Sequence, residues 1–232
     1  AEDSTLWIVG RTWNLPLLER SRHTSTPTPI DQTFRGPLRA LAAGSDFIVV
    51  VDDSGAVWMS VSPNLQPAGT QQRYSKQLQL VLGIPPMATV FAGIWHVLSV
   101  DEEGNLWGWG HNSCFQLAGK DQYMLPGRVP VPSRAFVIAA RTGNMASYIV
   151  TGDENLYVVG SNSNGCLGLT NQGIYAKWTR HPLKPSMQLK SRFKSARSIC
   201  TWENVLKKRK APSDSGIGED QEEDATGTIG VP

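Results

Sequence analysis

Short, mostly hydrophobic runs able to form strands recur along most of the chain, and each stands in the same local pattern. A glycine lies a few residues before the run, an acidic turn follows it, and a second apolar segment then carries an aromatic residue. The runs are 47–51, 97–100 and 147–150; the aromatic residues are Trp7, Trp58, Trp107 and Tyr157, spaced 51, 49 and 50 residues apart. Two apolar segments joined by a polar turn predict a β-hairpin. A hairpin recurring about every 50 residues is typical of a stacked or radial repeat fold.

The composition favours an all-β protein. The 22 glycines and 15 prolines among 232 residues suit many short strands joined by turns, and long helical periodicity is hard to find. The longest clean apolar run, 47–51, is too short to cross a membrane, so we expect no membrane association. The three cysteines, Cys114, Cys166 and Cys200, lie far apart, which argues against a disulfide framework and favours a reducing compartment.

The repeat resembles that of the regulator of chromosome condensation family. The resemblance covers roughly residues 1–190, and the best-matching segments are 92–98, 103–112, Gln116-Leu117, Gly160-Ser161-Asn162 and 165–168. Several positions depart from the family pattern. Phe115 and Ala118 stand where the family favours glycine, Cys166 replaces a glutamine, and Phe47 and Ala146 replace a histidine.

The resemblance implies an all-β fold, a β-propeller of these repeats. Family propellers usually have seven blades, whereas this chain holds about three and a half. An open arc leaves two strand edges exposed. Either the chain is part of a longer protein, or a partner supplies the rest. The repeated aromatic residues are predicted to be core wedges between blades.

The charge of the chain divides it into three predicted regions, although the net charge is only +2. Residues 1–190 form the propeller repeats. The basic segment 191–210 contains a candidate short helix, because Ile199, Trp202, Val205 and Leu206 can share one face. Residues 211–232 hold six acids and no base, lack aromatic residues, and are expected to be disordered.

Two short motifs in this tail suggest regulation. Lys207, Lys208, Arg209 and Lys210 resemble a nuclear import signal read by an import receptor, so we expect a nuclear and/or cytoplasmic protein. The alternative is a solvated basic stretch. Direct nucleic-acid binding is not favoured, because the adjacent acidic block would compete with phosphates. Asp214, Ser215 and Gly216 form a candidate phosphodegron.

No catalytic or metal-binding constellation is found, so we expect neither an enzyme nor a cofactor. The segment 160–165 is not a nucleophile elbow, because Asn162 stands where the nucleophile should be. The acids at 52–53 and 101–103 recur at the same point of successive repeats, as hairpin turns do. His96 is predicted to make a structural hydrogen bond inside its own blade. The other histidines lack metal-ligand spacing.

A noncatalytic protein-protein interaction module is therefore predicted. Partner contacts are expected at the loops after the aromatic strands, with His111, Phe115, Tyr123 and Tyr175 as candidate binding residues. The alternative for Phe115 is that it fills space between blades. The resemblance also implies two other functions, guanine-nucleotide exchange on a Ran-like small GTPase and service as a ubiquitin-ligase adaptor. The family resemblance also makes a small GTPase or a chromatin protein a candidate partner.

Overall fold

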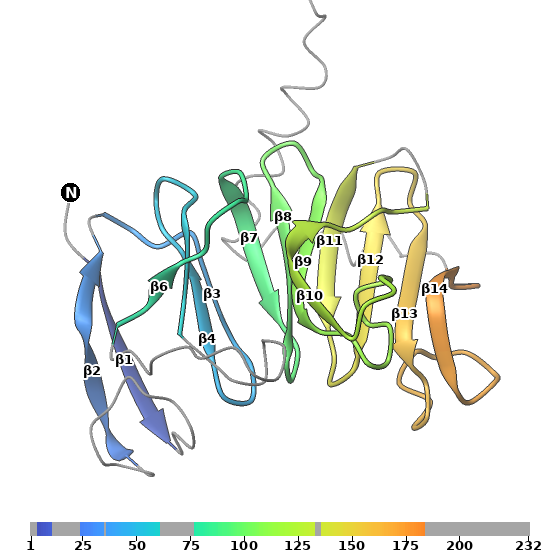
Figure 1. Cartoon of the computed structure of the whole chain (residues 1–232), viewed down its shortest axis with the longest axis horizontal. Coiled ribbons are helices and arrows are strands. Elements are labelled where there is room, and N and C mark those ends of the chain that lie inside the picture. Colours follow the sequence, from blue (N-terminus) through green and yellow to red (C-terminus); the bar gives the residue numbers. More distant parts are fainter. Residues whose placement is uncertain (1–3, 11–23, 35, 61–76, 133–135, 184–232) are drawn as a thin grey trace, which may run out of the picture.

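The computed structural model describes residues 4–10, 24–34, 36–60, 77–132 and 136–183 (Figure 1). Every regular element among these residues is a β-strand, and the strands form four antiparallel sheets. The first sheet, here called the half blade, contains β1 (Ser4–Gly10) and β2 (Thr24–Phe34). The all-β prediction is therefore confirmed for the described part of the chain.

The other three sheets have four strands each, and we call them the first, second and third full blades. The first contains β3 (Ala40–Ala43), β4 (Ile48–Val51), β5 (Val57–Met59) and β6 (Gln79–Leu80). The second contains β7 (Met87–Ala92), β8 (His96–Asp101), β9 (Leu106–His111) and β10 (Tyr123–Arg128). The third contains β11 (Val137–Thr142), β12 (Ala146–Thr151), β13 (Leu156–Ser161) and β14 (Ile174–Arg180).

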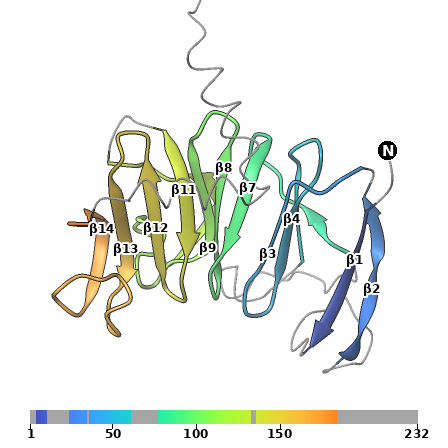
Figure 2. The same ribbon diagram turned by 180° about the vertical axis from the view of Figure 1, so that it is seen from behind.

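The sheets stand side by side in chain order and form an arc, as both views show (Figures 1 and 2). Within each full blade the strands pair in sequence order. The predicted hairpins are present, with the apolar run as second strand and the aromatic residue on the third: Val50 pairs with Trp58, Ser99 with Trp107, and Ile149 with Tyr157. Three full blades and one half blade match the predicted blade number.

The core lies between blades, which explains why the second strands are largely apolar. Alternate residues of a strand point to opposite faces. Val49 and Val51 of β4 pack toward the second full blade, against Met87 and Val90. Val50 between them packs toward the half blade, against Leu6, Ile30 and Phe34. Because both faces of the strand are covered, neither face can carry the polar residues of a half-exposed strand.

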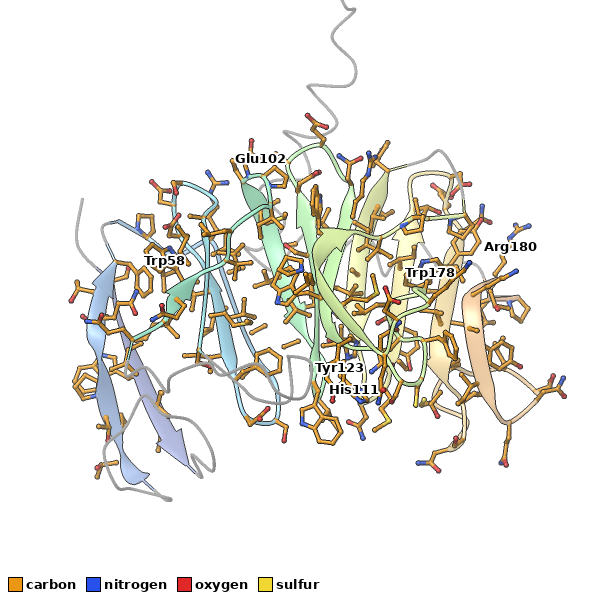
Figure 3. All side chains as sticks on the ribbon, in the orientation of Figure 1. Trp58, Glu102, His111, Tyr123, Trp178 and Arg180 are labelled. Carbon is orange, nitrogen blue, oxygen red and sulfur yellow. The ribbon has the colours of Figure 1, made fainter. Side chains whose placement is uncertain are left out.

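The two ends of the blades differ. At the acidic end, the turns Asp52–Gly55, Asp101–Gly104 and Thr151–Glu154 join second strands to third strands. At the loop end lie the glycine turns 44–46, 93–95 and 143–145, together with the connections 112–122 and 162–173 that follow β9 and β13. Figure 3 shows Glu102 at the acidic end and His111 and Tyr123 together at the loop end.

An aspartate and a tryptophan clamp the acidic turn in two full blades. Asp101 Oδ1 accepts the backbone N–H groups of Glu103 and Asn105, and Asp101 Oδ2 accepts the indole N–H of Trp107 at 2.9 Å. Asp52 and Trp58 repeat this arrangement, with the indole bond at 2.8 Å. The third full blade has Thr151 and Tyr157 instead, so both members of the pair change together. These acids thus have a turn-closing role, as the sequence predicted.

The wedge prediction is right for three of the four repeated aromatic residues. Trp58, Trp107 and Tyr157 are half-buried against cores between blades. Trp7 is 61% exposed, because its counterparts face the preceding blade and no blade precedes the half blade among the described residues. Among the described tryptophans, the fully buried one is Trp109, whose Nε1 donates to Met59 Sδ at 3.4 Å across the blade boundary.

His96 also differs from its predicted role. Its ring is buried, and Nε2 lies 3.1 Å from Ser147 Oγ of the third full blade, so the side-chain hydrogen bond joins two blades and does not lie inside one. Gly93 leaves the space for this ring, since a Cβ there would lie 2.1 Å from His96 Cε1. The predicted boundary at residue 190, the helix around Trp202, the basic tetrad, the candidate phosphodegron and the acidic tail lie outside the described residues.

Candidate functional site

A buried asparagine shapes each of the two long connections at the loop end. Asn112 Oδ1 accepts the N–H of Leu117 at 2.8 Å, and Nδ2 donates to the carbonyls of Gly119 and Asp121 at 3.1 and 2.9 Å. Asn162 makes the same three bonds in the next blade, with Leu167 N, Leu169 O and Asn171 O at 2.8, 3.0 and 2.8 Å. The two connections are therefore held in defined conformations by their own side chains.

The connection of the second full blade adopts this loop shape with non-glycine residues at two positions where the backbone is left-handed. Gly165 and Gly168 of the third full blade have φ of 68° and 67°, in the left-handed region. Their counterparts Phe115 and Ala118 have φ of 59° and 52°. Left-handed backbone is unfavourable for residues with a Cβ, and it persists only where the surrounding structure holds it. The loop that carries Phe115 therefore stores strain that its neighbour avoids.

Ala118→Gly is expected to stabilise the protein by about 1 kcal/mol, because it removes this strain. Gly165→Ala is the matched reverse change. A Cβ at Gly165 meets nothing within 4 Å, so this variant adds left-handed strain alone and should destabilise by about the same amount. Chemical denaturation of both variants measures the two values. If Ala118→Gly lowered the free energy of unfolding, the left-handed conformation would not be a source of strain.

An aromatic cluster of Trp95, His111 and Tyr123 lies beside this loop. The rings of Trp95 and His111 meet edge to face at a centroid separation of 5.5 Å, and those of His111 and Tyr123 at 5.1 Å. All three side chains are half-buried. The N–H of His111 donates to the carbonyl of Trp95 at 2.8 Å, and Tyr123 pairs with His111 in the β9–β10 register. The backbone therefore fixes the positions from which all three rings project.

The histidine of the cluster is neutral at physiological pH. Burial lowers the pKa of His111, since the charged ring would lose hydration. Its Nδ1 lies 3.4 Å from Gln116 Nε2 and from Ser113 Oγ. An amide Nε2 can only donate, so Nδ1 accepts and the neutral ring carries its proton on Nε2. The cluster consequently presents three uncharged rings, each with an apolar body and a polar edge.

The loop end is continuous from blade to blade. The N–H of Ser45 donates to the carbonyl of Ile94 at 3.0 Å, and the N–H of Ile94 donates to the carbonyl of Asn144 at 3.3 Å, so the three glycine turns are joined in a row. Cys114 Sγ lies 3.5 Å from Met145 Sδ, which connects the strained loop to the third full blade. A partner at this end would meet one connected surface.

The structure brings together some of the predicted binding residues. His111 and Tyr123 are in contact, and half-buried Phe115 belongs to the connection between their strands. Tyr175 lies apart on β14, where its hydroxyl donates to Asn171 O at 3.1 Å and its ring packs against Ala146, Val158 and Leu167. Its contacts brace the loop of the third full blade.

Sequence reasoning missed Trp95 and Gln116 as members of the site. Trp95 stands at a repeat position that holds Asp46 and Met145 in the other full blades. A tryptophan at a position so variable between repeats could have indicated a function other than folding. Gln116 was visible only as a family motif residue, whereas in the structure it is buried and its Oε1 accepts the N–H of Cys114 at 3.0 Å.

No metal-binding group was found in the described part of the chain, where no three His, Cys, Asp or Glu side chains gather closely enough to hold an ion. A search of the same residues finds no helix long and apolar enough to span a membrane. Among the described histidines, His96 lies between blades and His181 Nε2 lies 3.1 Å from Gly168 O, next to a loop glycine.

Comparison with known proteins shows which repeat family the chain resembles. Residues 88–116, from β7 to the strained loop, match the regulator of chromosome condensation (RCC1) repeat. The serine/threonine-protein kinase Nek9 of Mus musculus is 25% identical over 151 residues, which cover 62% of this chain and 15% of the kinase.

Solved structures with the same fold include yeast RCC1 (Prp20) bound to Kap60, with a TM-score of 0.62 and 16% identity over 79% of this chain and 45% of that one. Human WBSCR16 gives a TM-score of 0.58 with 19% identity, covering 75% and 44% of the two chains. Prp20p of Saccharomyces cerevisiae, described with its binding to Gsp1p and histones, gives 0.54 with 17% identity over 76% and 43%. The chain thus spans less than half the length of these structural relatives. Residues 88–116 thus match one regulator of chromosome condensation repeat, and the described sheets have the fold of β-propeller blades seen in these structures.

Proposed function

We propose that this chain is a noncatalytic protein-binding module that contacts its partner through the aromatic cluster Trp95, His111 and Tyr123 and the adjoining loop 112–122. The observation that carries this proposal is the coincidence of the cluster with the strained backbone at Phe115 and Ala118. Non-glycine residues in left-handed conformations concentrate at ligand-binding and switching sites. Of the three such residues in the described part of the chain, Phe115 and Ala118 lie in the loop that joins the strands of His111 and Tyr123, and Glu154 lies in the acidic turn of the third full blade.

The chemistry of the cluster suits a protein partner. Tryptophan and tyrosine are enriched at interfaces because they combine a large apolar surface with a polar edge and lose little conformational entropy on binding. The ring of His111 contacts the rings of both Trp95 and Tyr123, and His111 and Tyr123 lie on paired strands, so much of the rings' freedom is already lost before binding. Preorganisation of this kind reduces the entropic penalty of association.

The class of partner and the cellular location of this chain form part of the proposal. The structural relatives are described as bound to Kap60, or with binding to Gsp1p and histones. We infer a small GTPase or a chromatin protein as partner for this chain, and nuclear entry through the basic tetrad 207–210. The proposed organisation is a propeller arc to residue 190, a basic segment over 191–210 and an acidic tail over 211–232.

The test is partner capture from extracts of the source cells, compared quantitatively between the wild-type chain and two variants. Tyr123→Ala truncates a ring of the cluster. Leu125→Ala, on the same strand, truncates a side chain that is 76% exposed and serves as the matched control. We expect Tyr123→Ala to reduce recovery of specific partners at least tenfold, corresponding to about 1.4 kcal/mol, while Leu125→Ala leaves recovery unchanged.

The melting temperatures of both variants must be measured beside their recoveries. Equal recovery of partners by Tyr123→Ala and wild type would contradict the proposal. A loss of recovery no larger than the unfolded fraction of the variant would contradict it as well. Nucleotide exchange is tested separately with a Ran-like GTPase loaded with labelled GDP. A roughly 100-fold acceleration of release, about 2.7 kcal/mol of barrier, would assign exchange activity in place of binding alone.

A further inference from the structure

Each ring of the aromatic cluster carries one hydrogen-bond donor at its edge. Trp95 contributes the indole N–H, His111 the imidazole Nε2–H and Tyr123 the phenol O–H. Among the described residues none of these three groups has a hydrogen-bond partner, and none is a buried atom left without one. The three donors therefore lie at the surface of the loop end, where Figure 3 shows His111 and Tyr123 together.

The proton of His111 is held on Nε2 by a short chain of hydrogen bonds in the loop. The N–H of Cys114 donates to Gln116 Oε1 at 3.0 Å, so the amide nitrogen of Gln116 is the atom that faces His111. Gln116 Nε2 lies 3.4 Å from His111 Nδ1 and can only donate, so Nδ1 accepts. Because Gln116 is buried, its orientation is fixed. Gln116 is thus a positioning residue for the imidazole donor.

The folding of a blade does not require these donors. In the third full blade the corresponding positions hold Met145, Ser161 and Ile174. The register supports this correspondence, because Ser161 pairs with Ile174 across β13 and β14 as the two strands of the cluster pair across β9 and β10. Met145 and Ile174 carry no side-chain donor, and Ser161 Oγ already lies 2.9 Å from Ser163 Oγ. The set of three free donors is therefore a property of the second full blade.

The donors define the chemistry of a ligand for the cluster. An indole N–H and an imidazole Nε2–H can only donate, so the ligand must supply acceptors. A carboxylate has two oxygens that only accept, and hydrogen bonds to a charged acceptor are stronger than those to a neutral one. In the adjoining loop the exposed cation Lys120 is followed directly by the exposed anion Asp121. The ring donors, and not a net charge of the loop, therefore select the ligand.

We infer that the aromatic cluster binds an aspartate or glutamate side chain of the partner polypeptide, whose carboxylate accepts hydrogen bonds from His111 Nε2–H and from the donor of Trp95 or Tyr123. This inference rests on the proposed function and names the chemistry that the partner presents. The ring centroids lie 5.5 and 5.1 Å apart, so the donors stand on neighbouring rings. The apolar bodies of the rings exclude water around the carboxylate and strengthen each bond.

The experiment uses the full chain and the peptide acetyl-Gly-Glu-Glu-Glu-Gly-amide, with the glutamine peptide of the same length as control. Nitrogen-15 NMR of the histidines first establishes the tautomer of His111, which we expect to be protonated on Nε2. Titration should then show saturable binding of the glutamate peptide at millimolar concentrations, with shifts at His111. The glutamine peptide should bind at least about tenfold more weakly, because its acceptors are neutral.

Two conservative variants test the donors directly. Trp95→Phe and Tyr123→Phe each keep an aromatic ring and remove one donor. Each should weaken binding of the glutamate peptide by roughly threefold to tenfold, whereas Leu125→Ala on the same strand as Tyr123 should leave it unchanged. The melting temperatures of these variants show whether any loss exceeds unfolding.

The same variants separate this inference from the proposed function. In the partner-capture experiment, recovery that both phenylalanine variants retain and Tyr123→Ala loses would leave the proposed function standing and overturn the inference, because the rings would then bind through their apolar surface alone. Recovery that each phenylalanine variant also lowers is the result the inference predicts.

Four further outcomes overturn the inference. They are a His111 ring protonated on Nδ1, no saturable binding of the glutamate peptide up to about 10 mM, a Kd near the 2.7 kcal/mol level, and equal binding of the glutamate and glutamine peptides. The fourth concerns the acidic tail of the chain itself. If changing the acids of 219–224 to amides shifts the His111 signals of the free chain, the cluster is occupied by that tail and not by a partner.

Discussion

Gly93→Ala is expected to destabilise the protein by about 3 kcal/mol, at the upper end for overpacking of a filled core. A Cβ at Gly93 would lie 2.1 Å from His96 Cε1 and 2.7 Å from the carbonyl oxygen of Gly143. The first contact displaces a buried ring. The second involves backbone of the adjacent blade, which cannot move without disturbing the glycine turns hydrogen-bonded in a row. The variant therefore strains the joint between two blades.

Gly143→Ala provides the matched control, because it makes the same change at the same repeat position one blade later. The nearest atom to a Cβ there, Tyr148 Cε2, lies at 3.6 Å, an ordinary contact, since Ala146 replaces the ring found in the other blades. We expect a change within about 0.5 kcal/mol. Thermal unfolding of the two variants should differ by about 6–12 °C. Equal melting temperatures would show that the side chain three residues after the repeat glycine, His96 or Ala146, does not determine how much space is left for a Cβ at that glycine.

A second large effect is expected from pH, through His96. Burial lowers the pKa of His96 to about 4; a backbone hydrogen bond at Ala146 opposes this, and the charge of His111 adds to it. The folded pKa lies below the unfolded value of 6.5, so the unfolded chain binds more protons between these limits. Stability is therefore fully present above pH 6.5 and falls as the pH drops toward 4. The total loss is about 3 kcal/mol.

The chain itself supplies the control for this prediction. In the first full blade Phe47 takes the place of His96, and the neighbouring blade presents Val97 where Ser147 stands. The double variant His96→Phe and Ser147→Val copies that apolar pair and removes the titrating group. Its free energy of unfolding should fall much less between pH 6.5 and 4 than that of wild type.

Other titratable groups contribute little to the loss of stability between pH 6.5 and 4, or they also lower stability as the pH falls. His111, whose pKa is also lowered by burial, adds a smaller loss. For Asp52, burial raises the pKa, but hydrogen bonds from Ser54, Trp58 and Ala56 outweigh it and leave the pKa lowered, so its contribution is lost only below pH 3.8. An unchanged pH dependence in the double variant would show that His96 is not the source.

The blade architecture could be predicted from the sequence because each repeat buries the same positions. The second strands are covered on both faces, so they are largely apolar, and the acidic turns recur because Asp52 and Asp101 close them through the indoles of Trp58 and Trp107. The Asp-to-Trp spacing of six residues occurs in both of these blades and could have revealed the clamp.

The site was harder to predict because it depends on contacts between segments distant in the sequence. His111 and Tyr123 were identified from the loop that joins their strands, but Trp95 reaches them from the preceding glycine turn, which only the pairing of β8 with β9 brings close. Tyr175 was predicted from loop membership, whereas its ring packs inward. Trp7 was predicted to be buried from its place in the repeat, but it is exposed because no blade precedes the half blade among the described residues.

The most direct measurement of the binding account is hydrogen exchange of the full chain with and without its captured partner. The account predicts that slowed exchange is concentrated at the loop end, in residues 93–95 and 111–123, with the acidic turns 52–55, 101–104 and 151–154 unchanged. Protection confined to the acidic turns, with the aromatic cluster exchanging as in the free chain, would contradict it.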